Sequence, residues 1–329
     1  MAQALNDIGF AHYQLGAYDD AQAYLVQSAN AYAELGDDTG RIRTQQNLGL
    51  LATARGQWRE ARKQLETSLA AAEQQQMFEE VAVSRRNLAE LEWLQGHLAA
   101  AIMQARQAMK LFDERTDPRG LADAGLLEVQ ALLAAHADSA ASNALDKLAP
   151  SIAQAPAEQR GIAALLRAEL ARRGGNRAAQ TQALAEARRH AQASGVRLLQ
   201  LQAALADDTA IADPSLDATT TTLGHAALRL QWTAAAMARA QSAHDFATAV
   251  RLYRNALPLL RRGDSLHAHT LHALGANTLT QAGDSTAALS AADSATAALQ
   301  GLRARMPADL RKGFDAAQIP AQLATLPKR

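Results

Sequence analysis

Small and bulky apolar residues recur along the first third of the chain at a constant step of 40 residues. The stretches that start at Leu15, Arg55 and Gln95 each carry a glycine second, a bulky apolar residue fourth and an alanine seventh. Between these stretches, apolar residues follow the three-to-four-residue spacing of amphipathic helices. A fixed step of this length predicts stacked supersecondary units rather than a compact catalytic domain.

Each copy of the pattern predicts two helices joined by a tight turn. In the first copy, a helix is predicted from Asn6 to Leu15, and Gly16 follows in the left-handed conformation that ends helices. A second helix is predicted to begin at Tyr18 and to end at Gly36. Alanine dominates the composition and only 4% of the residues are aromatic, so the expected class is all-α.

This pattern resembles the tetratricopeptide repeat family, which requires small residues where the paired helices approach closely. The small residues that carry the resemblance are Gly9, Gly49 and Ala89 in the first helices, Gly16, Gly56 and Gly96 at the turns, and Ala21, Ala61, Ala101, Ser28, Ser68 and Ala108 in the second helices. The family period is about 34 residues, so a step of 40 fits longer helices. The resemblance implies a right-handed α-solenoid of about seven helical hairpins with a concave groove.

The regularity of the repeats divides the chain into five parts. We expect three regular repeats in 1–118, degenerate repeats in 119–206, an irregular segment in 207–224, two further repeats in 225–300, and a capping helix with a tail in 301–329. Within the irregular segment, the run Thr219 to Thr222 is interpreted as a loop rather than as a phosphorylation target. Before the fourth unit, Asp117 and Pro118 form a helix start.

The first helices of the three regular repeats are expected to line the concave groove. Asp7, Asn47 and Asn87 share one slot and predict a polar ladder that suits the backbone of an extended peptide. The other groove residues predicted to contact a partner are Asn6, Phe10, Tyr13, Arg43, Leu50, Arg86, Glu90 and Trp93. The alternative is a solvated helix face whose polar residues only keep the solenoid soluble.

Composition and motifs argue against several other functions. Basic and acidic residues balance at 33 each, which does not favour nucleic-acid binding, and there is no cysteine. No signal peptide, membrane-spanning stretch or catalytic motif is recognised, so we predict no catalytic residue, cofactor or membrane insertion. His267, His269 and His272 are interpreted as polar residues of an exposed helix rather than as a metal site, and Arg262-Gly263-Asp264 as the end of a helix rather than as an adhesion motif.

The sequence therefore predicts a non-catalytic protein-interaction module that binds a peptide or protein in its groove. The module is expected to be the scaffold or sensor part of a larger bacterial regulatory protein, such as a serine/threonine kinase or a transcription regulator. A cytoplasmic location is favoured, with a periplasmic one if the chain belongs to a membrane-anchored regulator. The alternative is a sensor for a small ligand or signal peptide, bound near 206–224. The partner and the oligomeric state are not indicated.

Overall fold

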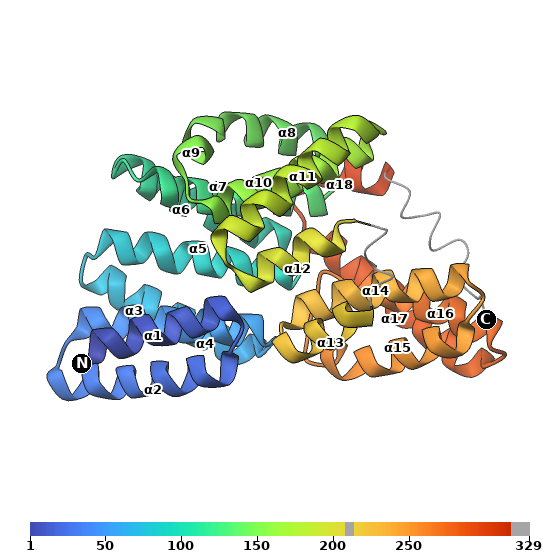
Figure 1. The fold of residues 1–329 in the computed structure, drawn as a ribbon, viewed down its shortest axis with the longest axis horizontal. Helices are drawn as coiled ribbons and strands as arrows, with labels where there is room; N and C mark the ends of the chain where they lie inside the picture. Colours follow the sequence, from blue (N-terminus) through green and yellow to red (C-terminus); the bar gives the residue numbers. More distant parts are fainter. Residues whose placement is uncertain (208–213, 317–329) are drawn as a thin grey trace.

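The structure is a computed structural model that describes residues 1–207 and 214–316. Over these ranges the chain is built from helices without a strand (Figure 1). The helices are α1 (Ala2–Leu15), α2 (Tyr18–Leu35), α3 (Asp38–Ala54), α4 (Trp58–Gln74), α5 (Phe78–Leu94), α6 (Leu98–Glu114), α7 (Pro118–Ala134), α8 (Asp138–Lys147), α9 (Ala149–Gln154), α10 (Ala157–Arg173), α11 (Arg177–Ser194), α12 (Arg197–Leu205), α13 (Pro214–Leu223), α14 (Ala226–Ser242), α15 (Phe246–Leu260), α16 (Ala268–Gln281), α17 (Ser285–Ala304) and α18 (Ala308–Ala316). The predicted all-α solenoid of helical hairpins is confirmed.

The 40-residue step arises from two helix–turn units of 20 residues each. Helices α3 to α7 are all 17 residues long, and a three-residue turn separates each from the next. Every turn contains one residue with positive φ, which lets the chain reverse direction. These residues are Gly16, Gly36, Gly56, Gln76, Gly96, Thr116 and His136.

Small residues in the first helix of a hairpin let the second helix pack closely against it, as predicted. A Cβ atom on Gly9 would lie 2.7 Å from the side chain of Leu25, and one on Gly49 would lie 2.5 Å from that of Leu65. Both leucines are fully buried. The described residues form seven such hairpins, which pair α1 with α2, α3 with α4, α5 with α6, α7 with α8, α10 with α11, α14 with α15, and α16 with α17.

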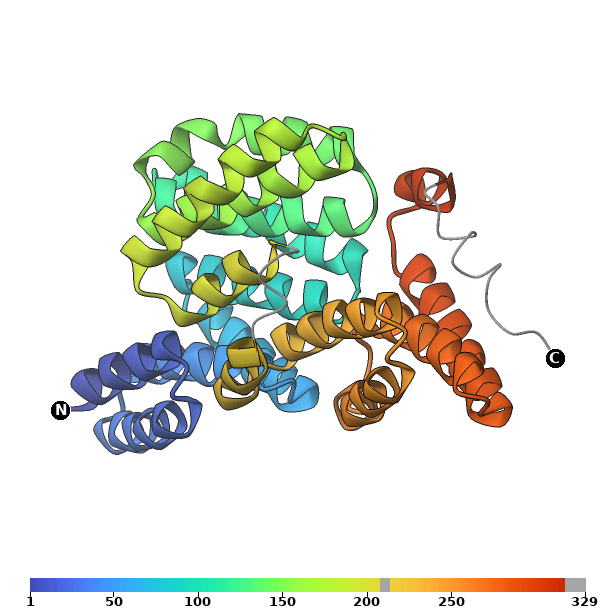
Figure 2. The same ribbon diagram turned by 45° about the vertical axis from the view of Figure 1, so that its right-hand side comes forward.

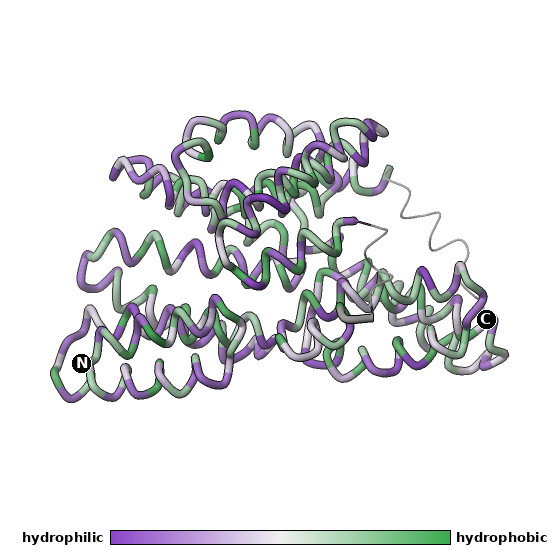
Figure 3. Tube along the Cα trace, viewed as in Figure 1, coloured by the Kyte–Doolittle hydropathy of each residue, from purple (hydrophilic) through white to green (hydrophobic). Residues whose placement is uncertain are grey.

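The hairpins belong to two arrays, a first array of helices α1 to α12 and a second array of helices α13 to α18. Figures 1 and 2 show the second array lying beside the first rather than extending the same stack. The green and purple segments of Figure 3 interleave along both arrays, as expected for helices with one buried face. Two large buried clusters each contain residues from both arrays, so apolar packing joins the arrays at two places.

The second array docks on the row of turns that joins the helices of each hairpin in the first array. A Cβ atom on Gly56 would lie 2.7 Å from the Cβ of Ala226, and one on Gly96 would lie 3.0 Å from Leu302. Backbone hydrogen bonds add to this contact: the Leu266 amide donates to the Leu94 carbonyl at 2.9 Å. The turns therefore act as an interface, in addition to reversing the chain.

Charged side chains of the Arg262-Gly263-Asp264 stretch take part in this docking. A terminal nitrogen of Arg262 donates to the Arg55 carbonyl at 2.7 Å, and Asp264 lies 3.4 Å from His97. The stretch follows the end of α15, and two of its side chains contact the first array, so it is not a free loop.

Two features of the second array differ from expectation. The prediction of an irregular segment over 207–224 is wrong for Pro214–Leu223, which form α13, and the predicted threonine loop is helical. Threonine hydroxyls there bond to backbone carbonyls four residues earlier, as at Thr221 and Thr222, which makes the run compatible with a helix. Residues 208–213 lie outside the described ranges.

The predicted capping helix exists as α18, but it packs against the first array rather than covering the last repeat of the second. Phe314 is fully buried, and its ring lies 5.8 Å from that of His136 in the α7–α8 turn. Phe314 shares a buried cluster with Leu133 and Met306, which come from the two arrays. The fourth turn of the first array is therefore covered as well.

Helix α12 is the element that shapes the concave side of the first array. It contacts α1, α10 and α14, so it spans from the end of the first array back to its beginning. Leu201 and Leu205 anchor it in a buried cluster with Tyr18 and Leu230. The concave side is thereby a partly enclosed space rather than an open groove.

Candidate functional site

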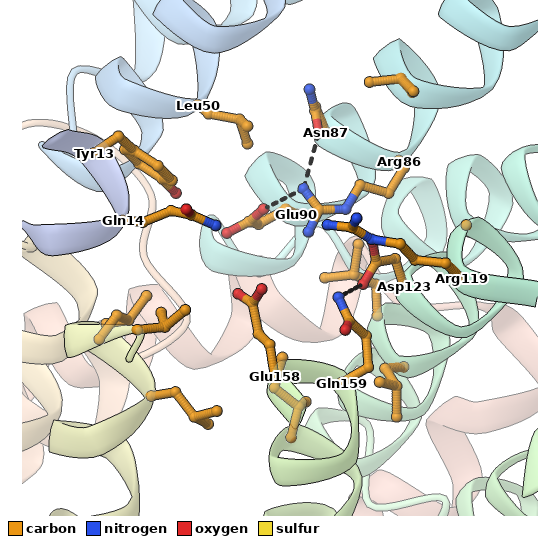
Figure 4. Close-up of a pocket in the computed structure, with 18 of the residues that line it drawn as sticks. Tyr13, Gln14, Leu50, Arg86, Asn87, Glu90, Arg119, Asp123, Glu158 and Gln159 are labelled. Carbon is orange, nitrogen blue, oxygen red and sulfur yellow. Dashed lines mark hydrogen bonds and ion pairs between the residues drawn. The ribbon is translucent and has the colours of Figure 1, made fainter. Parts of the chain in front are cut away.

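A cavity of about 430 Å³ lies on the concave side of the first array, and we call it the groove cavity (Figure 4). Helices α1, α3, α5, α7 and α10 contribute lining residues, and α12 closes it from the other side. Its lining includes Tyr13, Asn47, Leu50, Arg86, Asn87, Glu90, Trp93, Arg119, Asp123, Glu158, Gln159 and Gln202.

Most of the groove residues predicted from the sequence line this cavity. They are Phe10, Tyr13, Asn47, Leu50, Arg86, Asn87, Glu90 and Trp93. They come together because residues one 40-residue step apart occupy equivalent positions on neighbouring first helices. Three predicted residues lie outside the lining: Asn6, Asp7 and Arg43.

The three residues outside the lining have other surroundings. Asn6 accepts a hydrogen bond from the Asn47 side chain at 3.0 Å, and Asp7 is exposed. Arg43 pairs with the buried carboxylate of Glu80 at 2.6 Å. The expected polar ladder is therefore uneven, because Asp7 faces solvent, Asn47 is half-buried and Asn87 is buried.

Arg86 is at the centre of the polar lining. Its Nη1 donates to Asn87 Oδ1 at 2.9 Å and lies 3.3 Å from Glu90 Oε2. Desolvation alone would lower the pKa of Arg86, but the carboxylates of Glu90 and Asp123 outweigh it and raise that pKa. Arg86 is therefore a fixed positive charge held among carboxylates.

Helices α7 and α10 add polar residues that sequence reasoning missed. Gln159 donates through Nε2 to Asp123 Oδ1 at 2.6 Å. Glu158 makes no hydrogen bond or ion pair with another described residue, and its carboxyl faces the cavity in Figure 4. Desolvation, followed by the negative charge of Asp123, raises the pKa of Glu158.

A signal for these residues was present in the sequence. Asp123 lies one 40-residue step beyond Val83, which also lines the cavity. Glu79, Arg119 and Glu158 are each the second residue of a first helix, in α5, α7 and α10. The irregular turns of the fourth and fifth units hid this equivalence, since His136 replaces the turn glycine and α9 is inserted before α10.

Four buried polar atoms of the lining residues have no hydrogen-bond partner among the described residues. Three are donors, namely Arg86 Nε, Asn87 Nδ2 and Trp93 Nε1, and one is an acceptor, Gln159 Oε1. Buried polar groups are nearly always hydrogen-bonded, because an unpaired one costs about 1–3 kcal/mol. A site with this many unpaired atoms is suited to a polar ligand that supplies the missing partners.

The lining is acidic although the chain as a whole is neutral. Five carboxylates face two guanidinium groups, which gives the lining a formal charge of −3. The acidic residues are Glu79, Glu90, Asp117, Asp123 and Glu158, and the basic ones are Arg86 and Arg119. In a partly enclosed space such an excess favours cationic ligands.

The histidines at the start of α16, namely His267 at its N-cap and His269 and His272 within it, are more buried than the sequence suggested. Burial lowers the pKa of His267 and of His269 to about 4, and His272 Nδ1 lies 2.8 Å from the Tyr253 hydroxyl. The prediction of an exposed helix is wrong here, since α16 packs against α15 and α17. Among residues 1–207 and 214–316, no group of three potential ligands is arranged to hold a metal ion, and no helix has the length and apolar character needed to cross a membrane.

The fold and site thus define an all-α repeat protein with a polar, acidic concave cavity. Residues 1–74, which include α1 to α4, match the family model described as tetratricopeptide repeat. A crystal structure of yeast Tom70 aligns over 98% of this chain and 88% of its own, with 13% identity and a TM-score of 0.33. None of the curated proteins compared with the sequence matches it.

Proposed function

We propose that this chain is a non-catalytic protein-interaction module that holds an extended peptide segment of its partner in the groove cavity. The observation that carries the proposal is the set of unpaired donors: Arg86 Nε, Asn87 Nδ2 and Trp93 Nε1. The carbonyl groups of a peptide backbone supply acceptors for such donors at regular intervals. The match of residues 1–74 to tetratricopeptide repeats supports the same function, since repeat arrays of this kind present concave binding surfaces.

The proposal is tested with a bead-displayed library of random twelve-residue peptides. We expect the wild-type chain to enrich a defined set of sequences. Asn87→Ala is expected to weaken binding of the enriched peptides about fivefold, because it removes one backbone hydrogen bond. Trp93→Phe keeps an aromatic ring but removes the indole N–H, and is expected to weaken binding to a similar extent.

Asn30→Ala is the matched control, since Asn30 is exposed on α2 and lies outside the cavity lining. It is expected to leave peptide binding unchanged. The groove assignment is wrong if Asn87→Ala and Trp93→Phe bind the enriched peptides as the wild type does. Failure of the wild-type chain to enrich any peptide would contradict the proposed function itself.

A second candidate function is a sensor for a small ligand, and a second cavity favours it. This cavity of about 440 Å³ lies between the two arrays, where Leu205 and Ala206 of the first meet Gln231 and His267 of the second. A ligand there would change how the arrays sit together, which small-angle scattering with and without candidate ligands would detect. In either case we propose that the chain serves as the scaffold or sensor part of a larger bacterial regulator.

A further inference from the structure

We propose that the groove cavity selects partner segments that carry an arginine or lysine side chain, and that Glu158 and Gln159 receive its cationic group. This inference rests on the proposed function, because it specifies which peptides the groove accepts. Glu158 and Gln159 are the first two acidic or amide side chains of α10, and both line the cavity.

The acceptors at this end of the cavity lack donors. Gln159 is 2% exposed, and its amide is oriented by the hydrogen bond from Nε2 to Asp123, which leaves Oε1 without a partner among the described residues. The neighbouring Glu158 carboxylate makes no hydrogen bond or ion pair with them either. A guanidinium or ammonium group carries several donors and a positive charge, so it satisfies both acceptors at once.

The charged groups around Glu158 favour a cation over a neutral donor. Asp123 and Glu90 add negative charge, and only Arg86 and Arg119 of the lining oppose them. Arg86 is already paired with Glu90 at 3.3 Å. A bound cation would therefore be attracted by these carboxylates, and a negatively charged side chain would be rejected.

The two kinds of unpaired atoms lie at separate places, as a peptide ligand requires. In Figure 4, Asn87 and Glu158 lie on opposite sides of the Arg86–Glu90 pair. The donors at Asn87 and Trp93 suit backbone carbonyls, whereas the acceptors at Glu158 and Gln159 suit a basic side chain. One arginine or lysine residue provides both groups.

The test compares peptides enriched from the random library by the wild-type chain. We expect these peptides to share a basic residue at one fixed position. Replacement of an arginine there by citrulline, which has nearly the same shape but no charge, is expected to weaken binding at least about tenfold. In Glu158→Gln the same replacement is expected to change affinity by less than about threefold, and Glu34→Gln, on the exposed side of α2, is the matched control and should discriminate as the wild type does.

Each outcome decides between the two proposals. Equal affinity for the arginine and citrulline peptides, or enriched peptides without a basic position, overturns this inference but leaves peptide binding intact. Full discrimination by Glu158→Gln overturns the assignment to Glu158. If no peptide is enriched, the proposed function fails, and the selectivity with it. Glu158→Gln is expected to fold, because burial already disfavours the charged form of Glu158.

Discussion

At the scale of single residues, the turns show how strictly the backbone controls the sequence. Four of the first seven positive-φ turn positions are glycine, whereas Gln76, Thr116 and His136 occupy the same conformation with a side chain. The left-handed region is strained for such residues by roughly 1–2 kcal/mol, and most of all for a β-branched one. At these three positions the backbone is therefore strained, although the solenoid around them is regular.

Thr116→Gly is expected to stabilise the protein by about 0.5–1 kcal/mol. Relief of the left-handed strain exceeds the extra chain entropy that glycine gains in the unfolded state. The measurement is the midpoint of urea unfolding, which should rise. Thr67→Gly, in the middle of α4, serves as the control. It should lower the free energy of unfolding by a few tenths of a kcal/mol, and with it the midpoint, because glycine is the poorer helix former. A fall with Thr116→Gly would show that the threonine side chain contributes more than its strain removes.

At the scale of helices and turns, the turns of the first array both reverse the chain and contact the second array. Two glycines distinguish these two roles. Gly36 and Gly56 both have positive φ, at 62° and 67°. A Cβ atom on Gly36 would meet no atom within 4 Å, whereas one on Gly56 would lie 2.7 Å from Ala226 of the second array. Alanine at either position introduces the same backbone strain, but only Gly56→Ala also pushes the arrays apart.

We expect Gly36→Ala to destabilise the fold by about 1–2 kcal/mol and Gly56→Ala to destabilise it by a further 1–3 kcal/mol through overpacking. Urea midpoints of the two variants give the difference directly. Limited proteolysis adds a second readout, since loosened docking should make the connection between α12 and α14 easier to cleave in Gly56→Ala. Equal effects of the two substitutions would mean that the docked arrangement of the second array is wrong.

The same scale shows how far the sequence determines this structure. The helices of the first three repeats, their turns and the small residues at Gly9 and Gly49 follow from the 40-residue step, because each is set by contacts within one hairpin or between neighbours. The docking of the second array does not follow from it. Leu223, Ala226 and Leu266 are ordinary apolar residues whose partners lie some 170 to 207 positions away, and no local pattern links the two.

The candidate site was predictable in the same uneven way. Asn87, Arg86 and Trp93 lie in regular repeats, so their shared face could be expected. Glu158 and Gln159 follow an inserted helix, α9, which breaks the count, and their closeness to Asp123 depends on how α10 packs against α7. Closure of the cavity by α12 is likewise a tertiary effect. A periodic sequence therefore predicts the wall of a groove better than it predicts the enclosed site.

At the scale of the whole molecule, a chain of charged groups ties the two arrays together. Arg62 and His97 both contact Glu92 at 2.6 Å, His97 lies 3.4 Å from Asp264, and Arg305 pairs with Asp264 at 2.7 Å. Glu92 is 7% exposed. Desolvation would raise its pKa, but hydrogen bonds from His97 and Arg62 outweigh this effect and lower the pKa to about 2, from an ordinary value of 4.5.

This lowered pKa predicts how acid weakens the joined arrays. Because the folded-state pKa of Glu92 lies below the unfolded one, its contribution of about 3 kcal/mol is complete above pH 4.5 and is lost as the pH falls towards 2. Urea unfolding between pH 6 and pH 3 should therefore show a steeper loss of stability in the wild type than in Glu92→Gln, by about 2 kcal/mol at pH 3. Glu34→Gln, an exposed residue outside this chain of charges, should retain the wild-type slope. Parallel slopes for wild type and Glu92→Gln would show that Glu92 is not held ionised at the junction. The arrays would then be held together by apolar contacts, such as those of Leu302 and Phe314.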